Sequence, residues 1–112
     1  MNPLTTARVG GILQKAFVVM TGYNGMAPGR YKISWPWGKL ELYPDRVGLR
    51  IAFSQFDIPL KDIERVERHF LFMVRIHHRN QAVPAYVAVY GWGLLSKLKS
   101  ASRIYRLALP FA

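Results

Sequence analysis

Runs of alternating apolar side chains within residues 38–66 constrain the fold more than any other feature of this sequence. Apolar side chains occupy every second position in residues 39–43 and again in residues 47–53. A period of two places one apolar set on a single face of a β-strand. Between the two runs, Pro44 presets the backbone and Asp45 can bond to it, as in a β-turn. The pattern therefore predicts an antiparallel hairpin that is buried on one side.

A third strand continues the same pattern, with Phe56, Ile58 and Leu60 on one face. Pro59 has no amide hydrogen to donate, so it marks an edge strand or a bulge. Residues 63–66, bracketed by isoleucine and valine, are expected to form a tight corner after this strand.

The second half of the chain predicts two further strands, over residues 70–78 and 85–90. Residues 79–84 between them are polar and end in proline, which is typical of a hairpin loop. The side chains expected on the core faces are Phe72, Val74 and Ile76 in the first strand, and Val87 and Val89 in the second. Gly91 ends the returning strand.

Residues 94–106 are predicted to form the last element, an amphipathic helix. At about 100° per residue, its apolar and basic side chains fall on opposite sides. The apolar side holds Leu94, Leu98, Ala101, Ile104 and Tyr105, and the basic side holds Lys99, Arg103 and Arg106. Such a helix either packs as a lid on the open end of a sheet or lies on an anionic membrane.

The amino-terminal segment is predicted to be separate from this sheet. Apolar spacing from Thr5 to Met20 favours a short helix, although Gly10-Gly11 weakens it and residues 17–19 suit a strand equally well. Residues 23–29 contain Asn-Gly and Pro-Gly turn signals and are expected to form a loop. We therefore expect an N-terminal segment over residues 1–29 and a single domain over residues 30–112.

The composition excludes several classes of protein. The chain has 112 residues and no cysteine, so disulfides, thiolate zinc sites and thiol catalysis are ruled out. No apolar run approaches the length of about 20 residues that spans a bilayer, and no signal peptide is recognisable. We expect a cytoplasmic protein, with attachment to the periphery of a membrane as a further expectation.

The charge distribution predicts attraction to polyanions. Formal net charge is +10, and all six acidic residues fall between positions 41 and 67. The basic residues outside this window are uncompensated along the chain. Such a protein is drawn to nucleic acid, anionic lipid or an acidic protein surface, unless the charge serves solubility alone.

Residues 30–39 combine aromatic and basic side chains in an unusual way. In an extended backbone Trp35 and Trp37 project to the same side, near Arg30, Lys32 and Lys39. Indoles beside cations can stack on bases or lie at a lipid interface. The alternative is that the two tryptophans cover one open end of the core.

Known catalytic and metal-binding patterns are not recognisable. His77 and His78 are adjacent in a predicted strand, so they point to opposite faces, and His69 joins them only if the fold allows it. Residues 91–96 superficially suit a phosphate-binding glycine loop, but too little chain follows for a βαβ unit. We therefore expect no enzyme, no metal and no cofactor.

Residues 38–42, 45–49 and 58–66 together resemble the small bacterial pleckstrin-homology-like (PH-like) and GRAM-type domains. In these, a strand, a turn and a strand precede an I-P-x-x-x-I-x-x-V corner, a hairpin and a closing helix. The resemblance covers about residues 38–103 and implies a mainly β fold, a curved antiparallel sheet or barrel closed by the last helix. Where phosphoinositide-binding members carry basic residues in the first hairpin, this chain has Glu41 and Asp45. A small Sm, SH3 or OB-type barrel is the alternative fold.

The resemblance implies a non-enzymatic module that binds lipid headgroups, peptides or partner proteins. We expect an anionic membrane surface or a protein partner, with a sequence-tolerant nucleic-acid binder or a subunit of a homo-oligomer as alternatives. The residues expected to bind are Arg30, Lys32, Trp35, Trp37, Lys39, Lys99, Arg103 and Arg106.

Overall fold

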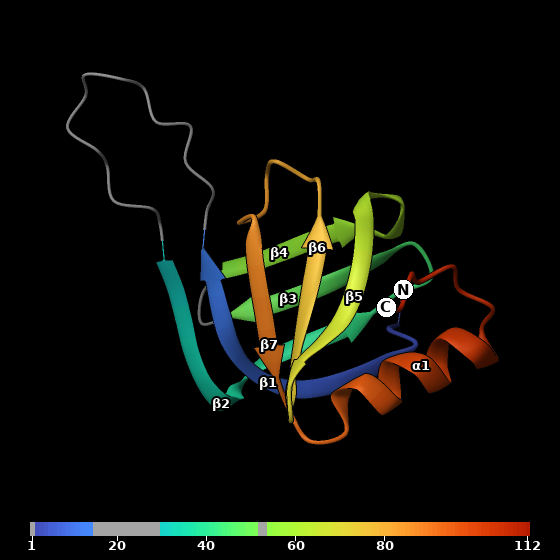
Figure 1. Cartoon of the computed structure of the whole chain (residues 1–112), viewed down its shortest axis with the longest axis horizontal. Coiled ribbons are helices and arrows are strands. Elements are labelled where there is room, and N and C mark those ends of the chain that lie inside the picture. The colour runs from blue at the N-terminus through green and yellow to red at the C-terminus, as the bar shows by residue number, and fades with distance from the viewer. Residues whose placement is uncertain (1, 15–29, 52–53) are drawn as a thin grey trace.

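An antiparallel sheet of seven strands, with a helix after the last strand, makes up the described part of the chain, residues 2–14, 30–51 and 54–112 of a computed structural model. The strands are β1 (Thr5–Gln14), β2 (Arg30–Leu42), β3 (Arg46–Ile51), β4 (Ser54–Pro59), β5 (Ile63–Phe70), β6 (Met73–His78) and β7 (Tyr86–Tyr90). A 3-10 turn (Leu60–Asp62) joins β4 to β5, and α1 (Leu94–Ile104) follows β7. The sheet order is β4-β3-β2-β1-β7-β6-β5. The sheet curls into a half-barrel, and α1 lies across one end of it (Figure 1).

The core lies inside this curl and follows the period of two. Leu40 and Leu42 of β2 are fully buried, and in β3 the core residues Val47, Leu49 and Ile51 occupy every second position. Together with Ile58, Val74, Ile76, Val87 and Val89, they confirm the predicted faces of β2, β3, β4, β6 and β7. From α1, Leu94, Leu98 and Ala101 pack into the same cluster, so the helix acts as the predicted lid.

The edges of the sheet are treated differently. The strand β4 lies at one edge and ends in Pro59, as predicted from its missing amide hydrogen. At the other edge, the C-terminal tail covers β5: the Val66 amide donates to the Pro110 carbonyl at 2.8 Å, and the Ala112 amide donates to the Val66 carbonyl at 2.9 Å. None of the described helices is long and apolar enough to cross a lipid bilayer.

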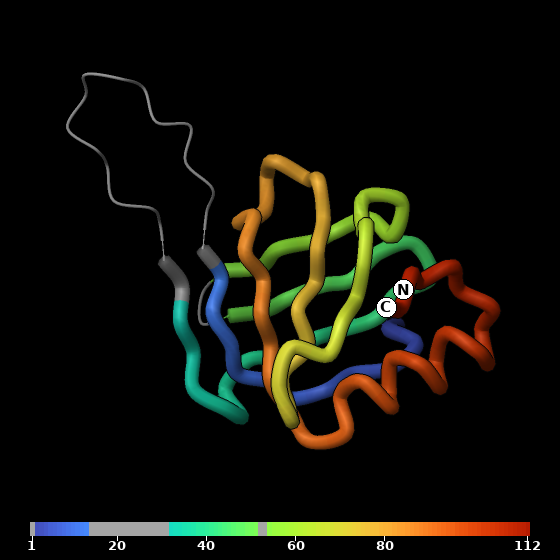
Figure 2. The backbone as a smooth tube through the Cα atoms, viewed as in Figure 1, coloured from blue at the N-terminus to red at the C-terminus, as the bar shows by residue number. Residues whose placement is uncertain are grey.

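The helix predicted for the amino-terminal segment is wrong over Thr5–Gln14, which form β1. This strand lies at the centre of the sheet, paired with β2 along its length and with β7 from Gly10 onward. It bends sharply where its register shifts between Val9 and Gly11, as the tube in Figure 2 makes visible. The two glycines allow close contact: a Cβ at Gly11 would lie 2.4 Å from the Ala88 carbonyl oxygen. The rest of the predicted helix and the loop at 23–29 lie outside the described residues.

Two further predictions fail where apolar residues are exposed. Residues 63–70 form β5 instead of a corner and the start of a strand, and Leu71 and Phe72 form the turn into β6. Phe72 is therefore exposed, not in the core. Ile104 and Tyr105 are also exposed, because the helix ends at Ile104 and the chain turns through a positive φ of 54° at Arg106.

Candidate functional site

A row of basic side chains crosses the outer face of the sheet. Arg8 of β1 is directly opposite Lys39 of β2, and Lys39 is directly opposite Arg50 of β3. All three side chains are exposed, and Gln55 continues the row on β4. Like charges that face each other across strands destabilise a sheet. We call Arg8, Lys39 and Arg50 the cation row; its unfavourable charge placement makes it a candidate binding surface.

The neighbouring carboxylates are engaged by other residues. Glu41, two residues after Lys39 in β2, accepts a 3.1 Å hydrogen bond from the Tyr43 hydroxyl. Burial and this hydrogen bond both raise the pKa of Tyr43. Asp57 lies 3.6 Å from Arg46. Among the described residues, no carboxylate oxygen comes within 4.0 Å of a side-chain nitrogen of the cation row.

Beside the cation row is a hollow of about 440 Å³, in which aromatic and basic side chains from four segments meet. Its lining residues include Arg8 and Lys39 of the row, Lys97 from α1, and two indoles, Trp35 from β2 and Trp92 from the loop before α1. No acidic residue is among the described residues that line it. We call it the tryptophan hollow; it offers flat apolar walls and three positive charges to an anionic ligand.

Trp35 is held in place through its backbone. Its amide donates a hydrogen bond to the Tyr90 hydroxyl at 3.3 Å, and the Tyr90 ring passes directly over Gly10. A Cβ on Gly10 would lie only 2.4 Å from the Trp35 nitrogen. Gly10, which weakens the helix predicted from the sequence, is thus the residue that lets β2 and β7 approach β1 here.

A second apolar surface, the aromatic ridge, is formed by Phe70, Leu71, Phe72 and Trp92. Phe70 is 70% exposed, and Leu71 and Phe72 are exposed at the β5–β6 turn. Trp92 packs against Phe72 with 4.4 Å between ring centroids, so the ridge joins the tryptophan hollow through Trp92. A smaller hollow of about 210 Å³ beside the ridge includes Arg68. Exposed apolar residues that gather this way mark an interaction surface.

Of the predicted binding residues, Trp35 and Lys39 come together in the tryptophan hollow. Trp35 is 42% exposed and Trp37 is 75% exposed, so the alternative that the two tryptophans close one end of the core is wrong. Lys32 is exposed opposite Ile12 on β1. The side chain of Arg30 lies outside the described residues.

The predicted basic residues of the last helix are exposed but lie apart from this site. None of Lys99, Arg103 and Arg106 is among the described residues that line the tryptophan hollow. Lys99 instead places its amine 5.8 Å from the centre of the Phe111 ring in the C-terminal tail.

The sequence did not single out Arg8, Lys97, Trp92 and the tip of the aromatic ridge. One signal was available for Trp92, because a tryptophan between two glycines lies in a turn that cannot bury it well. Another was the alternation of Thr6, Ala7, Arg8 and Val9, which predicts an outward arginine if the segment is read as a strand.

His77 and His78 have separate partners. His77 Nε2 donates to Glu67 at 2.7 Å, and this hydrogen bond lowers the pKa of Glu67. His78 Nε2 donates to the Pro84 carbonyl at 2.7 Å, and its Nδ1 accepts from the Asn80 amide. Within residues 2–14, 30–51 and 54–112, no group of three histidine or acidic residues could hold a metal ion.

The chain matches no known family model, no curated protein and no solved structure in comparisons with known proteins.

Proposed function

We propose that this chain is a non-enzymatic, PH-like interaction module that binds an anionic membrane surface. The observation that carries the proposal is the aromatic ridge, in which Phe70, Leu71 and the tilted ring pair of Phe72 and Trp92 are exposed next to cations that pair with no carboxylate among the described residues. Membrane interfaces favour aromatic side chains, and anionic headgroups attract lysine and arginine. The order of seven antiparallel strands and a terminal helix supports the PH-like assignment.

The binding energies favour a mechanism in which the cations and the exposed apolar side chains of the aromatic ridge act together. Each cation near an anionic surface contributes about 1 kcal/mol, so Arg8, Lys39 and Lys97 supply about 3 kcal/mol. That alone is weaker than millimolar affinity, because a millimolar Kd needs about 4 kcal/mol. Burying the side chains of Phe70 and Leu71 adds about 2 kcal/mol or more, which brings binding into a useful range.

Co-sedimentation with vesicles tests this proposal. The full chain should bind phosphatidylcholine vesicles that contain phosphatidylserine, and bind plain phosphatidylcholine vesicles much less. Replacing Phe70 and Leu71 with serine should weaken binding by roughly thirtyfold, the equivalent of about 2 kcal/mol. Both side chains are exposed, so circular dichroism should show an unchanged fold.

The matched control is Ile104→Ser, because Ile104 is 71% exposed but lies at the end of α1, away from the ridge. Equal losses in the ridge variant and the control would refute an oriented membrane contact. Binding that is insensitive to both phosphatidylserine and salt would refute the role of the cations.

A single-stranded nucleic acid is the second candidate ligand, favoured by the tryptophan hollow. Trp35 and Trp92 beside Arg8, Lys39 and Lys97 offer the combination of stacking faces and phosphate contacts that single strands use. Here the test is a single-stranded oligonucleotide titration, with affinity falling steeply as salt rises. Trp35→Ala should then weaken oligonucleotide binding, whereas the serine variants of Phe70 and Leu71 should leave it unchanged.

A further inference from the structure

The first half of β1 has a partner strand on one side only. Residues Thr5–Val9 pair with β2, but β7 pairs with β1 only from Gly10 onward. In the described part of the chain, no other strand takes the vacant side, which faces α1. A strand edge of this kind is a template for an added strand.

The backbone groups left at this edge are the amide and carbonyl of Thr6 and the amide of Arg8. The Val9 carbonyl points toward β2, because its oxygen would lie 2.6 Å from a Cβ on Gly38. The Arg8 carbonyl points the other way and is covered by Gly91, because its oxygen would lie 2.9 Å from a Cβ on Gly91. Since successive residues of a strand alternate, Thr6 also directs its amide and carbonyl away from β2.

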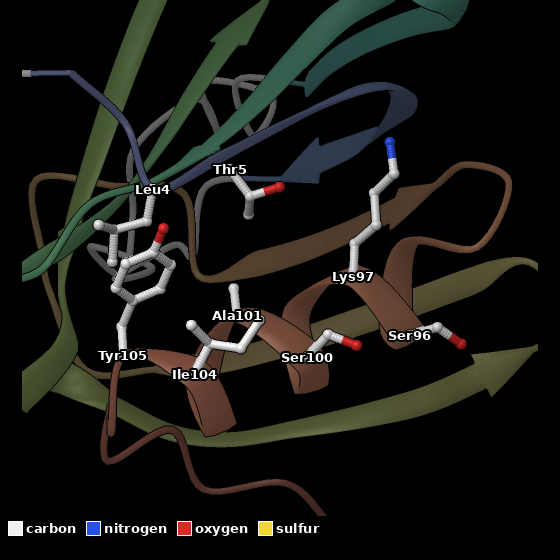
Figure 3. A pocket seen from close by; sticks show the side chains of 8 residues that line it. All are labelled: Leu4, Thr5, Ser96, Lys97, Ser100, Ala101, Ile104 and Tyr105. Atoms are coloured by element: carbon white, nitrogen blue, oxygen red, sulfur yellow. The ribbon is translucent and has the colours of Figure 1, made fainter.

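A groove runs along this edge between β1 and α1. One hollow of about 330 Å³ lies between Leu4 and Thr5 on one side and the flank of α1 on the other. Figure 3 shows Lys97 extending from the helix toward β1, with Ile104 and Tyr105 at the opposite end of the groove. The tryptophan hollow continues the same line past Thr6, Ala7 and Arg8, and Lys97 lines both hollows.

The chemistry of the groove selects its occupant. Its charged lining residues are Arg8, Lys39 and Lys97, and no acidic side chain is among the described residues that line either hollow. The apolar surface comes from Ala101 and Ile104 on the helix side. A second copy of this chain, with its net charge of +10, would bring like charges together here.

We propose that an extended acidic segment of a partner protein adds to the free edge of β1 in this groove. Its backbone pairs with the Thr6 amide and carbonyl and with the Arg8 amide, and its side chains alternate between the two sides, as in any strand. Carboxylates at every second position face Arg8 and Lys97, and apolar residues between them face Ala101 and Ile104. The segment needs only about five residues to span the edge, at about 3.4 Å per residue.

Selection from a library of random decapeptides displayed on phage, with the full chain as target, tests the proposal. Enriched peptides should alternate acidic and apolar residues, and a synthetic copy should shift the backbone amide NMR signals of Thr6 and Arg8. Lys97→Glu should weaken this peptide by about tenfold, the scale of one charge-assisted contact. The same exchange should not harm folding, since an acidic residue near the start of a helix is favourable. Thr6→Pro should also weaken the peptide, because it removes the amide that faces the groove.

Lys99→Glu is the matched control, as it changes the same charge on the flank of α1 that faces Phe111. It should leave peptide affinity unchanged. The proposal is overturned if no peptide is enriched, if the enriched peptides are neutral or basic, or if Lys97→Glu and Lys99→Glu act alike. A concentration-dependent dimer in light scattering that Thr6→Pro abolishes would overturn it in favour of a second copy. Loss of vesicle binding in the variants of Phe70 and Leu71, with peptide binding retained, separates this proposal from the membrane function.

Discussion

Replacing Gly10 with alanine tests whether β1 is a strand packed under Tyr90 and against Trp35. A Cβ at this position would lie 2.4 Å from the Trp35 backbone nitrogen and 2.7 Å from Cζ of Tyr90. Cβ atoms essentially never lie within 3.0 Å of such neighbours, so the Tyr90 ring and the β2 backbone must both move. The movement separates the Tyr90 hydroxyl from the Trp35 amide, a hydrogen bond of 3.3 Å.

We expect Gly10→Ala to lower the free energy of unfolding by about 2–4 kcal/mol. Overpacking a filled site costs about 1–3 kcal/mol. The lost hydrogen bond to the Trp35 amide adds about 1 kcal/mol. Unfolding entropy of about 2.1 cal/mol/K per residue gives about 4 °C of Tm per kcal/mol for a chain of 112 residues, so Tm should fall by about 8–17 °C.

Scanning calorimetry measures this change, and Gly93→Ala provides the comparison. Gly93 has a φ of 62°, and in the described part of the chain no atom lies within 4 Å of a Cβ built there. Gly93→Ala should lower the free energy of unfolding only by the strain of a left-handed backbone, about 1 kcal/mol. If the segment were the helix that its apolar spacing favours, Gly10→Ala would instead raise stability by about 1 kcal/mol. A higher Tm for Gly10→Ala would therefore refute the packing described for β1.

Three further changes should alter stability in stated directions. Ser102 is buried in α1, and its hydroxyl has no hydrogen-bond partner among the described residues, so Ser102→Ala should raise Tm by about 4 °C, or about 1 kcal/mol; a lower Tm would contradict this. The folded-state pKa of Glu67 is lowered, so its contribution is present above the ordinary value of 4.5 and is lost as pH falls below it; Glu67→Gln should flatten the dependence of Tm on pH in that range. Lys39→Gln removes two like-charge pairs and should stabilise the sheet by about 0.5 kcal/mol in urea unfolding at low salt, with no gain left at high salt.

The hairpin of β2 and β3 was predictable because its determinants are local. Pro44 and Asp45 determine the turn, and the alternation of Leu40 and Leu42 determines which face of the hairpin is buried. Neither depends on which element packs against that face. The position of Pro59 also has a local cause, because a residue without an amide hydrogen is favoured at the edge of a sheet. These elements need no knowledge of distant residues.

The strand β1 was not predictable in the same way, because its glycines have a tertiary reason. Gly10 and Gly11 read as weak helix positions until Tyr90 and Ala88, almost eighty residues later in the sequence, are placed over them. The alternation of apolar and polar residues from Thr6 to Val9 indicates a strand. The apolar spacing farther along the segment fits a helix equally well.

The predictions for Phe72 of the aromatic ridge and for the exposed end of α1 are wrong for a shared reason. Apolar residues such as Phe72 and Ile104 are assigned to the core by default, because burial is the usual fate of large apolar side chains. The turn at Leu71 and Phe72 contains no glycine or proline, so the sequence gives no turn signal there. The helix ends at Ile104 and the backbone turns at Arg106, so the helical period no longer applies at Tyr105.

Only two of the residues that line the tryptophan hollow could be brought together from the sequence. Trp35 and Lys39 are neighbours in β2, so their combination is visible in one segment. Arg8, Trp92 and Lys97 join them only because β1 lies beside β2 and α1 returns under β1. The sequence could identify the residue types that bind anions, but not the segments that meet.

Trp92 and Lys97 couple the two proposed binding surfaces. Trp92 belongs to both the aromatic ridge and the tryptophan hollow, and Lys97 lines both the hollow and the groove along β1. A peptide carboxylate that pairs with Lys97 removes one charge from the membrane contact, worth about 1 kcal/mol or roughly a fivefold loss of vesicle affinity. Because coupling between two sites is reciprocal, saturating vesicles must weaken the peptide by the same factor. Vesicle sedimentation with and without a selected peptide measures this factor, and independence of the two ligands would mean that they do not share Lys97.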